Sequence, residues 1–189
     1  TEVTWELYDA FVFRLDEPAA AGGDGPAPDA IVRPSHPHVL ADHGFGHAGY
    51  PVISVNDEGA LAFCAWLSAR TGRTCRLPTE AEFEAPCATA PPATVAGVET
   101  EGTARDTLLG QAWLRENSER RTHPVAARAA NALGLHDLVG NAAEWCVAAD
   151  GSRVVRGASY LDRARDAGCA NRKLPVPAWN ADDPQLPKS

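Results

Sequence analysis

The run NALGLHDLVGNAAEWC, from Asn131 to Cys146, carries two acids and a central amide within a mostly apolar segment. Asp137, Asn141 and Glu144 stand among leucine, valine, alanine and glycine residues. A buried carboxylate is costly unless a cation or a hydrogen-bond donor meets it. The pattern therefore indicates either a bound hard cation or a structural use of the two acids, as turn caps or as partners of an arginine.

The clearest predicted helix lies upstream of this run, in NDEGALAFCAWLSARTG, from Asn56 to Gly72. Asn56 or Asp57 is a suitable capping residue, and acids follow in the first turn, where the helix dipole favours negative charge. Gly72 is the kind of residue that commonly ends a helix. These signals together predict a helix over residues 56–72.

The next run, RLPTEAEFE from Arg76 to Glu84, predicts a second helix. Thr79 and Glu82 fit the T-x-x-E capping box, in which each residue satisfies a backbone N–H of the other. Glu80 and Glu82 are regularly spaced acids, but the helix dipole and capping explain them better than acid–base catalysis does.

The remaining pattern is sparse. Residues 4–15 place Trp, Tyr, Phe and Val at helical spacing, and residues 152–160, SRVVRGASY, form the best candidate strand. Residues 16–50 and 174–189 are rich in Pro, Gly or Ala and predict irregular structure, and the weak pattern of residues 88–122 also predicts mainly loop. The layout is α+β with an unusually large irregular fraction.

Length and composition predict one globular domain over residues 1–189, since 44% of the residues are hydrophobic and 22% are charged. The net charge of −8 disfavours nucleic acid as a partner and mildly favours cation binding. No run approaches the ~18 apolar residues of a transmembrane helix. The sequence lacks methionine and begins at Thr1, so we expect a mature or trimmed chain. Nucleophile-elbow, P-loop, dinucleotide-binding and H-E-x-x-H zinc motifs are missing from it.

The five cysteines are widely spaced, and no two of them form a C-x-x-C pair. That spacing excludes a zinc ribbon and a thioredoxin-like site. Cysteines of an exported protein would pair in part, whereas those of a cytosolic protein would be small buried hydrophobic residues. The five are Cys64, Cys75, Cys87, Cys146 and Cys169.

One histidine-rich segment, HPHVLADHGFGH, is a weaker candidate for a transition-metal site. Its imidazoles and carboxylate are ligand types that zinc, iron and copper accept. The segment is also rich in Gly and Pro, so a solvated polar loop is the alternative and the favoured interpretation. The candidate ligands are His36, His38, Asp42, His43 and His47.

Taken in order, the runs PVISV, AFCAWLSARTGR, RLPTEAEFE, NALGLHDLVGNAAEWC, VVRGASY and CANR resemble the sulfatase-modifying factor family, whose founding activity is the formylglycine-generating enzyme. The resemblance extends from about residue 3 to the end of the chain. It implies a compact, loop-rich C-type-lectin-like fold with two helices and a small twisted antiparallel sheet. Ala132, Ala143, Phe83 and Ala85 replace larger aromatic residues of the family. The final strand of the family is also expected to be missing.

The resemblance implies a calcium ion at the opening run. By position its ligands would be Asp137, the backbone carbonyls of Gly140 and Ala142, and Glu144. Calcium takes six to eight oxygen ligands and mixes carboxylates with carbonyls and waters, so this donor set is chemically suitable. The same resemblance makes Asn141 a turn residue suited to left-handed backbone geometry.

The family's copper(I) site is not expected here. The founding enzymes bind copper(I) through a cysteine pair shortly after a strand that resembles VVRGASY, because soft thiolates suit that ion. In this chain the residues after Tyr160 are LDRARDAG, and the next cysteine is Cys169. The related sulfoxide synthases take iron from histidines largely on a separate helical domain, which this sequence lacks. We therefore predict no catalytic residues of the copper type.

A disulfide between Cys87 and Cys169 is the next implication of the resemblance, with two reduced core thiols as the alternative. Cys64 is expected to stay free, because its family partner lies in the missing final strand. The compartment is unknown from sequence, but a real disulfide would favour a periplasmic or extracellular location.

Two functions from different classes remain open. The first is a non-catalytic, calcium-stabilised lectin-like module that serves as a binding or accessory subunit in a larger protein assembly. The second is an oxidative enzyme of the same family with a diverged active site. The lost cysteine pair favours the first. The Pro-rich stretches 16–30 and 174–189 also favour it, because such segments dock readily on other protein subunits.

Overall fold

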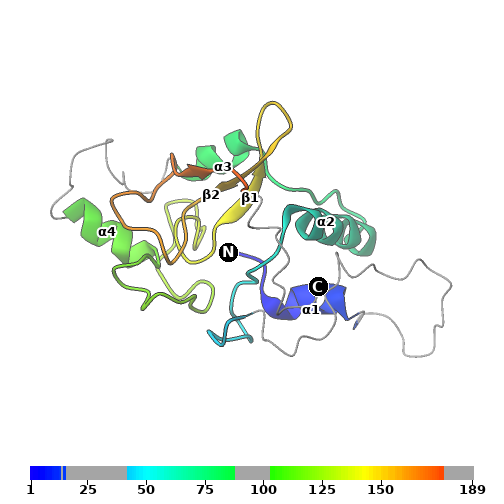
Figure 1. Ribbon diagram of the computed structural model, residues 1–189, viewed down its shortest axis with the longest axis horizontal. Coiled ribbons are helices and arrows are strands. Elements are labelled where there is room, and N and C mark those ends of the chain that lie inside the picture. Colours follow the sequence, from blue (N-terminus) through cyan, green and yellow to red (C-terminus); the bar gives the residue numbers. More distant parts are fainter. Residues whose placement is uncertain (14, 16–41, 88–102, 177–189) are drawn as a thin grey trace.

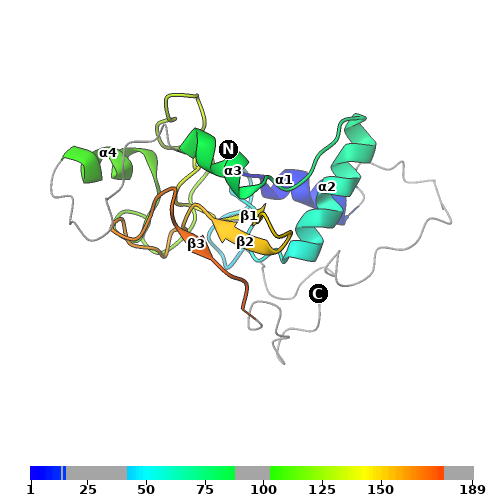
Figure 2. The ribbon, with the colours of Figure 1, turned by 90° about the horizontal axis from the view of Figure 1, so that it is seen from above.

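The structure is a computed structural model of the 189-residue chain, and it describes residues 1–13, 15, 42–87 and 103–176. Its helices are α1 (Trp5–Val12), α2 (Asp57–Thr71), α3 (Glu80–Cys87) and α4 (Thr103–Gln111). Its strands are β1 (Glu144–Val147), β2 (Arg153–Arg156) and β3 (Arg172–Lys173). Helices α1 and α2 lie at one side of the molecule and α4 at the other, with the sheet between them (Figures 1 and 2). The α+β, loop-rich fold predicted from sequence is confirmed.

The sheet is small and antiparallel, with strand order β1-β2-β3. Glu144 of the opening run pairs with Arg156, and Val155 of β2 pairs with Lys173 of β3. The strand expected over residues 152–160 is shorter than predicted, because Gly157 (φ 87°) turns the chain out of extended geometry. A β-carbon at Gly157 would lie 2.9 Å from the Leu138 carbonyl oxygen, so the sheet edge approaches the opening run closely.

The helix predicted over residues 56–72 and the helix predicted in RLPTEAEFE are both confirmed, as α2 and α3, together with their caps. The Asn56 side chain accepts a hydrogen bond from the Gly59 N–H at the start of α2, and Gly72 ends that helix in left-handed geometry. At α3 the N–H of Thr79 donates to the Glu82 carboxylate at 2.8 Å, and the Glu82 N–H donates to the Thr79 hydroxyl at 3.2 Å. The capping box is therefore formed in both directions.

Glu80 lies in the first turn of α3, as the helix-dipole interpretation predicts, and it has a further role. Its carboxylate accepts hydrogen bonds from Arg156 and Arg172, each at 2.8 Å, so it joins α3 to the sheet. The reciprocal cap of this helix is formed by Glu82 and Thr79. Arg156 is only 3% exposed and also contacts Glu84 at 2.5 Å.

Helix α1 packs against α2 through aromatic side chains. Tyr8, Phe11 and Phe63 are buried, and their ring centroids lie 5.5–5.8 Å apart. Edge-to-face and tilted contacts at this range add to the stabilisation that each buried aromatic gives, about 1.5–3 kcal/mol from area alone. Trp66 extends the cluster toward the end of α2. This packing holds α2 against α1.

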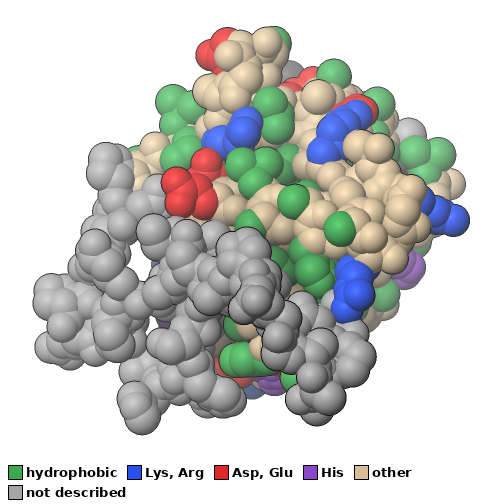
Figure 3. Space-filling model, turned by 90° about the vertical axis from the view of Figure 1, so that its right-hand side faces the viewer, with side chains coloured by type: hydrophobic (Ala, Val, Ile, Leu, Met, Phe, Trp, Pro, Cys, Tyr) green, Lys and Arg blue, Asp and Glu red, His purple; other side chains and the backbone are tan. Residues whose placement is uncertain are grey.

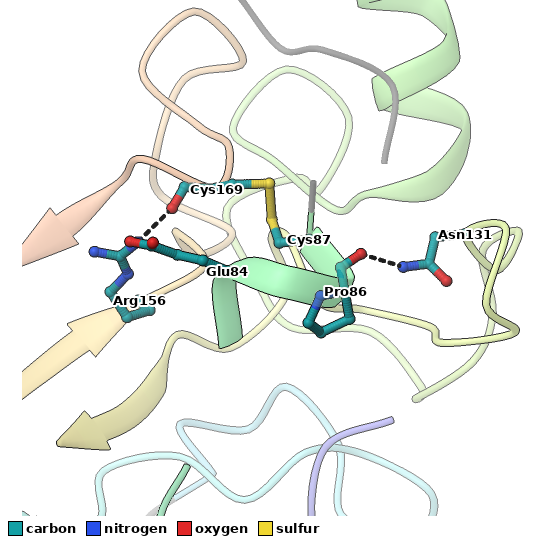
Figure 4. Close-up of a disulfide and its surroundings, with 6 residues drawn as sticks. All are labelled: Glu84, Pro86, Cys87, Asn131, Arg156 and Cys169. Atoms are coloured by element: carbon teal, nitrogen blue, oxygen red, sulfur yellow. Dashed lines mark hydrogen bonds and ion pairs between the residues drawn. A yellow bond between two sulfur atoms is a disulfide. The ribbon is translucent and has the colours of Figure 1, made fainter. Parts of the chain in front are cut away.

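A second core lies beneath the sheet and includes Cys87, which is fully buried. Cys87 is joined by a disulfide to Cys169, with a Cα–Cα distance of 5.4 Å (Figure 4). The predicted pairing is confirmed, and the alternative of two reduced thiols is wrong. The Cys169 carbonyl accepts a hydrogen bond from Arg156 at 2.6 Å, so the same buried arginine contacts both α3 and the disulfide loop.

Helix α4 was not predicted. It lies in the stretch that the sequence pattern assigned mainly to loop, and the reason is its weak amphipathicity. Among its described side chains Leu108 is buried, at 3% exposure, while Arg105, Asp106 and Thr107 are exposed. Packing of Leu108 into the second core, together with the partly buried Leu109, holds the helix.

The irregular segments are described only in part. Residues 42–50 form turns against α1, with the Trp5 N–H donating to the Tyr50 carbonyl. Leu174 is 58% exposed, and residues 16–41 and 177–189 lie outside the described part of the chain. The expectations of a missing final strand and of ordering against a neighbour therefore stay predictions.

Two surface properties bear on partners. No helix among the described residues is long and apolar enough to cross a membrane. On the face shown in Figure 3, the described residues present hydrophobic, basic and acidic side chains interspersed with one another. That visible surface does not carry the single-sign basic patch that a nucleic-acid interface needs.

Candidate functional site

The opening run forms a tight loop that leads into β1. Asp137, Gly140 and Asn141 all have left-handed backbone geometry, with φ of 58°, 87° and 53°. A β-carbon at Gly140 would lie 2.5 Å from the carbonyl oxygen of Trp113, so only glycine fits this close approach. The loop is thus pressed against the backbone of a distant segment.

Asp137 is a buried carboxylate with only one of its oxygens satisfied. The side chain is 2% exposed, and its Oδ2 accepts a hydrogen bond from the Ala126 N–H at 2.6 Å. Its Oδ1 is buried and has no hydrogen-bond partner. Neither Asp137 nor Glu144 forms an ion pair with an arginine of the described residues, so the arginine alternative of the sequence analysis receives no support. Burial of an unpaired carboxylate oxygen is costly.

Two further carboxylates lie close by, Glu144 and Glu2. Burial raises the pKa of Glu144 to about 7; the positive charge of the N-terminus opposes this shift, and the charge of Asp137 adds to it. Burial raises the pKa of Glu2 to about 9, again with a contribution from Asp137. Glu2 accepts a hydrogen bond from the Ala142 N–H at 3.1 Å through Oε1, while its buried Oε2 has no partner.

Glu2 was missed by sequence reasoning, and no local signal could have found it. It stands 140 positions from its partner Ala142, at the start of the chain. The segment that carries it is held by the hydrogen bond from the Val52 N–H to the Val3 carbonyl, at 2.9 Å. Tertiary structure alone brings this acid beside the opening run.

These residues fit a hard cation. The buried Oδ1 of Asp137 accepts no hydrogen bond, so it is available as a metal ligand. Calcium is held by carboxylates together with backbone carbonyls. Within the described residues no three His, Cys, Asp or Glu side chains gather at metal-ligand spacing. A set formed by Asp137, Glu144 and two carbonyls needs only two such side chains, so it is compatible with that finding.

Asn141 connects this loop to its surroundings and has the left-handed geometry predicted for it. Its side chain is fully buried and bonds both backbone groups of His123, at 2.9 Å and 3.1 Å. Its own N–H donates to the Trp113 carbonyl, and its carbonyl accepts from the Tyr160 N–H, at 2.8 Å and 2.9 Å. Four hydrogen bonds therefore tie the loop to three separate segments.

Replacement of Asn141 by alanine should lower the free energy of unfolding by about 2–3 kcal/mol. Two buried hydrogen bonds disappear, the backbone groups of His123 lose their partner, and alanine is strained in left-handed geometry. Urea denaturation followed by circular dichroism measures the change. Asn171→Ala, which removes one exposed hydrogen bond, is the control and should cost less than about 0.5 kcal/mol. Equal effects of the two variants would contradict this role of Asn141.

The segment after Tyr160 is where the family resemblance places a cysteine pair. Asp162 stands there, and it accepts hydrogen bonds from the Ser159 N–H at 2.8 Å and the Ser159 hydroxyl at 2.9 Å. Lys173 of β3 contacts both Asp162 oxygens, at 2.5 Å and 2.6 Å. The cysteine that follows, Cys169, is in the disulfide. The described side chains of this segment are therefore used for structure and include no free thiol.

A groove of about 960 Å³ lies beside β1 and α2. Its lining includes Glu144 of the opening run, Phe63 of α2, Trp145 of β1, and Ser159 and Tyr160. Grooves of this size with apolar walls and a few polar groups are typical ligand or peptide sites. Residues 142–144 of the opening run and residues 159–160 thus border one groove.

The histidine-rich segment is described only from Asp42 onward, so His36 and His38 lie outside the described residues. His47 lies between two carboxylates, with Nε2 at 2.7 Å from Asp9 and Nδ1 at 3.4 Å from Asp42. His43 contacts the Ser54 hydroxyl at 3.2 Å instead. His47 thus links the loop of residues 42–50 to α1.

His47 should make stability depend on pH. Its hydrogen bond to Asp9 raises the pKa of the imidazole above its ordinary value near 6.5. The stabilisation is therefore fully present below about pH 6.5 and is lost as the pH rises through the folded-state pKa. Because His47 is nearly half exposed, the effect should stay below about 1 kcal/mol.

Melting temperatures of the wild type and of His47→Gln, measured from pH 5 to pH 9, check this expectation. The two curves should differ at acidic pH and converge at alkaline pH. His43→Gln serves as the control for loss of a neighbouring histidine and should follow the wild-type profile. A constant gap between wild type and His47→Gln over the whole range would contradict the pH dependence.

Comparison with known proteins places these features in context. The profile of the family described as "Sulfatase-modifying factor enzyme 1-like domain" matches residues 1–183. The chain is 35% identical over 138 residues to the "Inactive C-alpha-formylglycine-generating enzyme 2" of Bos taurus, covering 67% of this chain and 43% of that protein. It is 35% identical over 106 residues to the "Formylglycine-generating enzyme" of Mycobacterium tuberculosis, covering 52% and 33%.

A solved structure agrees with the sequence matches. "Treponema denticola variable protein 1" superposes with a TM-score of 0.64 at 26% identity, over 93% of this chain and 77% of that one. The chain spans less than half the length of the curated relatives it matches. Relatives of this fold thus include both a protein named as an enzyme and one named as inactive.

Proposed function

This chain belongs to the sulfatase-modifying factor enzyme 1-like family, and on that premise we propose that it is a non-catalytic, calcium-stabilised module of the family that binds other protein subunits. The observation that carries the proposal is that the segment after Tyr160 contains no cysteine before Cys169, which is in the disulfide. Asp162 of that segment is bound by Ser159 and Lys173, so the segment contributes a structural ion pair.

A thiol pair and a partly exposed ion pair have different chemical uses. Copper(I) binding needs two soft, deprotonated sulfurs, and a carboxylate does not replace them. Ser159 donates two hydrogen bonds to Asp162 and Lys173 contacts both of its oxygens, so this carboxylate is already engaged in a structural ion pair. The likeness to a relative named as inactive supports the same conclusion.

Calcium is the second part of the proposal. Asp137 and Glu144 would supply carboxylate oxygens, and the carbonyls of Gly140 and Ala142 would complete the protein's share of the ligands. When bound, the ion would supply positive charge to a region where burial already disfavours ionised acids. The unpartnered oxygens of Asp137 and Glu2 support this assignment.

Binding is the third part. The groove between α2 and the segment of Ser159 and Tyr160 would receive an extended segment of a partner protein, because its walls are apolar and its rim offers polar groups. The 87–169 disulfide favours an exported setting for such a complex.

The size of the protein in native extracts of its source tests the accessory role. Size-exclusion chromatography with light scattering should find it in a particle larger than the 20.0 kDa chain. Hydrogen exchange should show that residues 53–55 and 159–160 at the groove are protected in that particle and exposed in the isolated chain. A monomer in extracts, with equal exchange at the groove, would refute the subunit role and leave the calcium proposal to its own test.

A further inference from the structure

Two cysteines on the groove wall have no part in the proposed function. Cys64 lies in the middle of α2, and Cys75 lies in the segment that follows this helix. Both are free, both are partly buried, and both line the groove. They are eleven positions apart in sequence (75 − 64), and Gly72 ends α2 between them, so that their backbones lie on either side of Ser68.

The Ser68 hydroxyl holds the backbones of the two cysteines together. It lies 2.8 Å from the Cys64 carbonyl oxygen and 3.1 Å from the Cys75 carbonyl oxygen. It also accepts the Cys75 N–H at 2.8 Å. The two carbonyl oxygens are therefore no farther apart than the sum of the first two distances, about 6 Å, so the backbones of the two cysteines run close together at Ser68.

The thiols also affect each other electrostatically. Burial raises the pKa of the Cys64 thiol, and the charge of Cys75 raises it further. Like-charge coupling of this kind disfavours the thiolate of Cys64 while both thiols are reduced. It agrees with the backbone geometry around Ser68.

We propose that Cys64 and Cys75 form a redox-active dithiol site on the groove wall, which closes to an intramolecular disulfide by exchange with a low-molecular-weight disulfide such as oxidised glutathione. The site is independent of the calcium motif and of the partner-binding role. It would fasten α2 to the segment that leads into α3, and so fix one wall of the groove.

The exchange proceeds in two balanced steps. One cysteine thiolate attacks a sulfur of oxidised glutathione, which forms a mixed disulfide and releases one glutathione thiolate. The second cysteine thiolate then attacks the protein sulfur of the mixed disulfide and releases the second glutathione. The two protons of the cysteine thiols pass to the released glutathione molecules. The protein loses two electrons, and the oxidant gains them.

Cys146 offers an internal comparison. It is the third free thiol of the chain, but it is fully buried in β1, and burial raises its pKa to about 12. Reactivity toward disulfides follows thiolate character and access. Cys146 should therefore stay reduced in the folded protein under conditions that oxidise the groove pair.

The test incubates the folded full chain with oxidised glutathione, blocks the remaining thiols with N-ethylmaleimide in acid, and maps the peptides by mass spectrometry. The expected product is one peptide pair linked between Cys64 and Cys75, with Cys146 alkylated. The link should raise the melting temperature by about 5 °C, since it closes a short loop in a domain of this size. In Cys75→Ser, Cys64 should carry a glutathione adduct and form no link.

The peptide map of the wild-type protein tests the proposal by itself, without the Cys75→Ser variant. Glutathione adducts on Cys64 and Cys75 with no link between them, at excess oxidant, would overturn the proposal. Recovery of both cysteines as unmodified thiols would overturn it too, as would a link from either one to Cys146.

Discussion

Replacement of Cys87 and Cys169 together by alanine is expected to lower the free energy of unfolding by about 4 kcal/mol. The disulfide closes a loop of 82 residues, and loss of that constraint gives the unfolded chain many more conformations. The loop contains α4 and the opening run, so it spans most of the second core. For a domain of this size a loss of that magnitude is a large share of total stability.

Urea denaturation of the double variant and the wild type, both without reductant, measures this difference. Cys64→Ser is the matched control, because it removes a cysteine that is outside the disulfide and only partly buried. It should change stability by much less than the double variant. A double variant within about 1 kcal/mol of wild type would contradict the expected role of the disulfide.

Removal of calcium is expected to lower the free energy of unfolding by a similar amount. A ligand that binds only the folded state stabilises it by about 3–4 kcal/mol when present at 100–1,000 times its dissociation constant. Chelator should therefore lower the melting temperature clearly. Without the ion, burial and the charge of Asp137 would again disfavour the ionised form of Glu144.

Glu144→Gln should reproduce the effect of chelator and should no longer respond to it. Glu58→Gln, at an exposed acid in the first turn of α2, is the control and should respond to chelator as the wild type does. Differential scanning calorimetry with and without chelator measures all three proteins. Superimposable wild-type curves, together with no heat of calcium binding, would refute the calcium assignment.

The helices with strong local signals could be predicted from sequence, and those without could not. Helix α2 has an amide cap and a glycine stop, and α3 has a reciprocal capping box, so local chemistry sets their limits. Helix α4 is held by tertiary packing of Leu108 and carries no such signal. The 87–169 disulfide was predicted from family resemblance, since the spacing of the five cysteines left the pairing open.

The site was predictable only where its residues are contiguous. Asp137, Asn141 and Glu144 stand within eight positions of one another, and their mixture of acids and apolar neighbours marked the loop. Glu2 and Lys173 reach the region through long-range contacts, and no pattern along the chain connects them to it. Glu80 was assigned to helix capping because its partner arginines are 76 and 92 positions away.

Oxygen uptake in the presence of copper(I) and a cysteine-bearing peptide is the measurement that tests the non-catalytic assignment most directly. The "Formylglycine-generating enzyme" of Mycobacterium tuberculosis is measured alongside as the positive control, and it is chosen for the activity that its name states. We predict that this chain leaves the uptake at the rate of copper and peptide alone, because the segment after Tyr160 has no cysteine before Cys169, which is in the disulfide. Uptake that rises in proportion to protein concentration, with conversion of the peptide cysteine, would contradict the assignment.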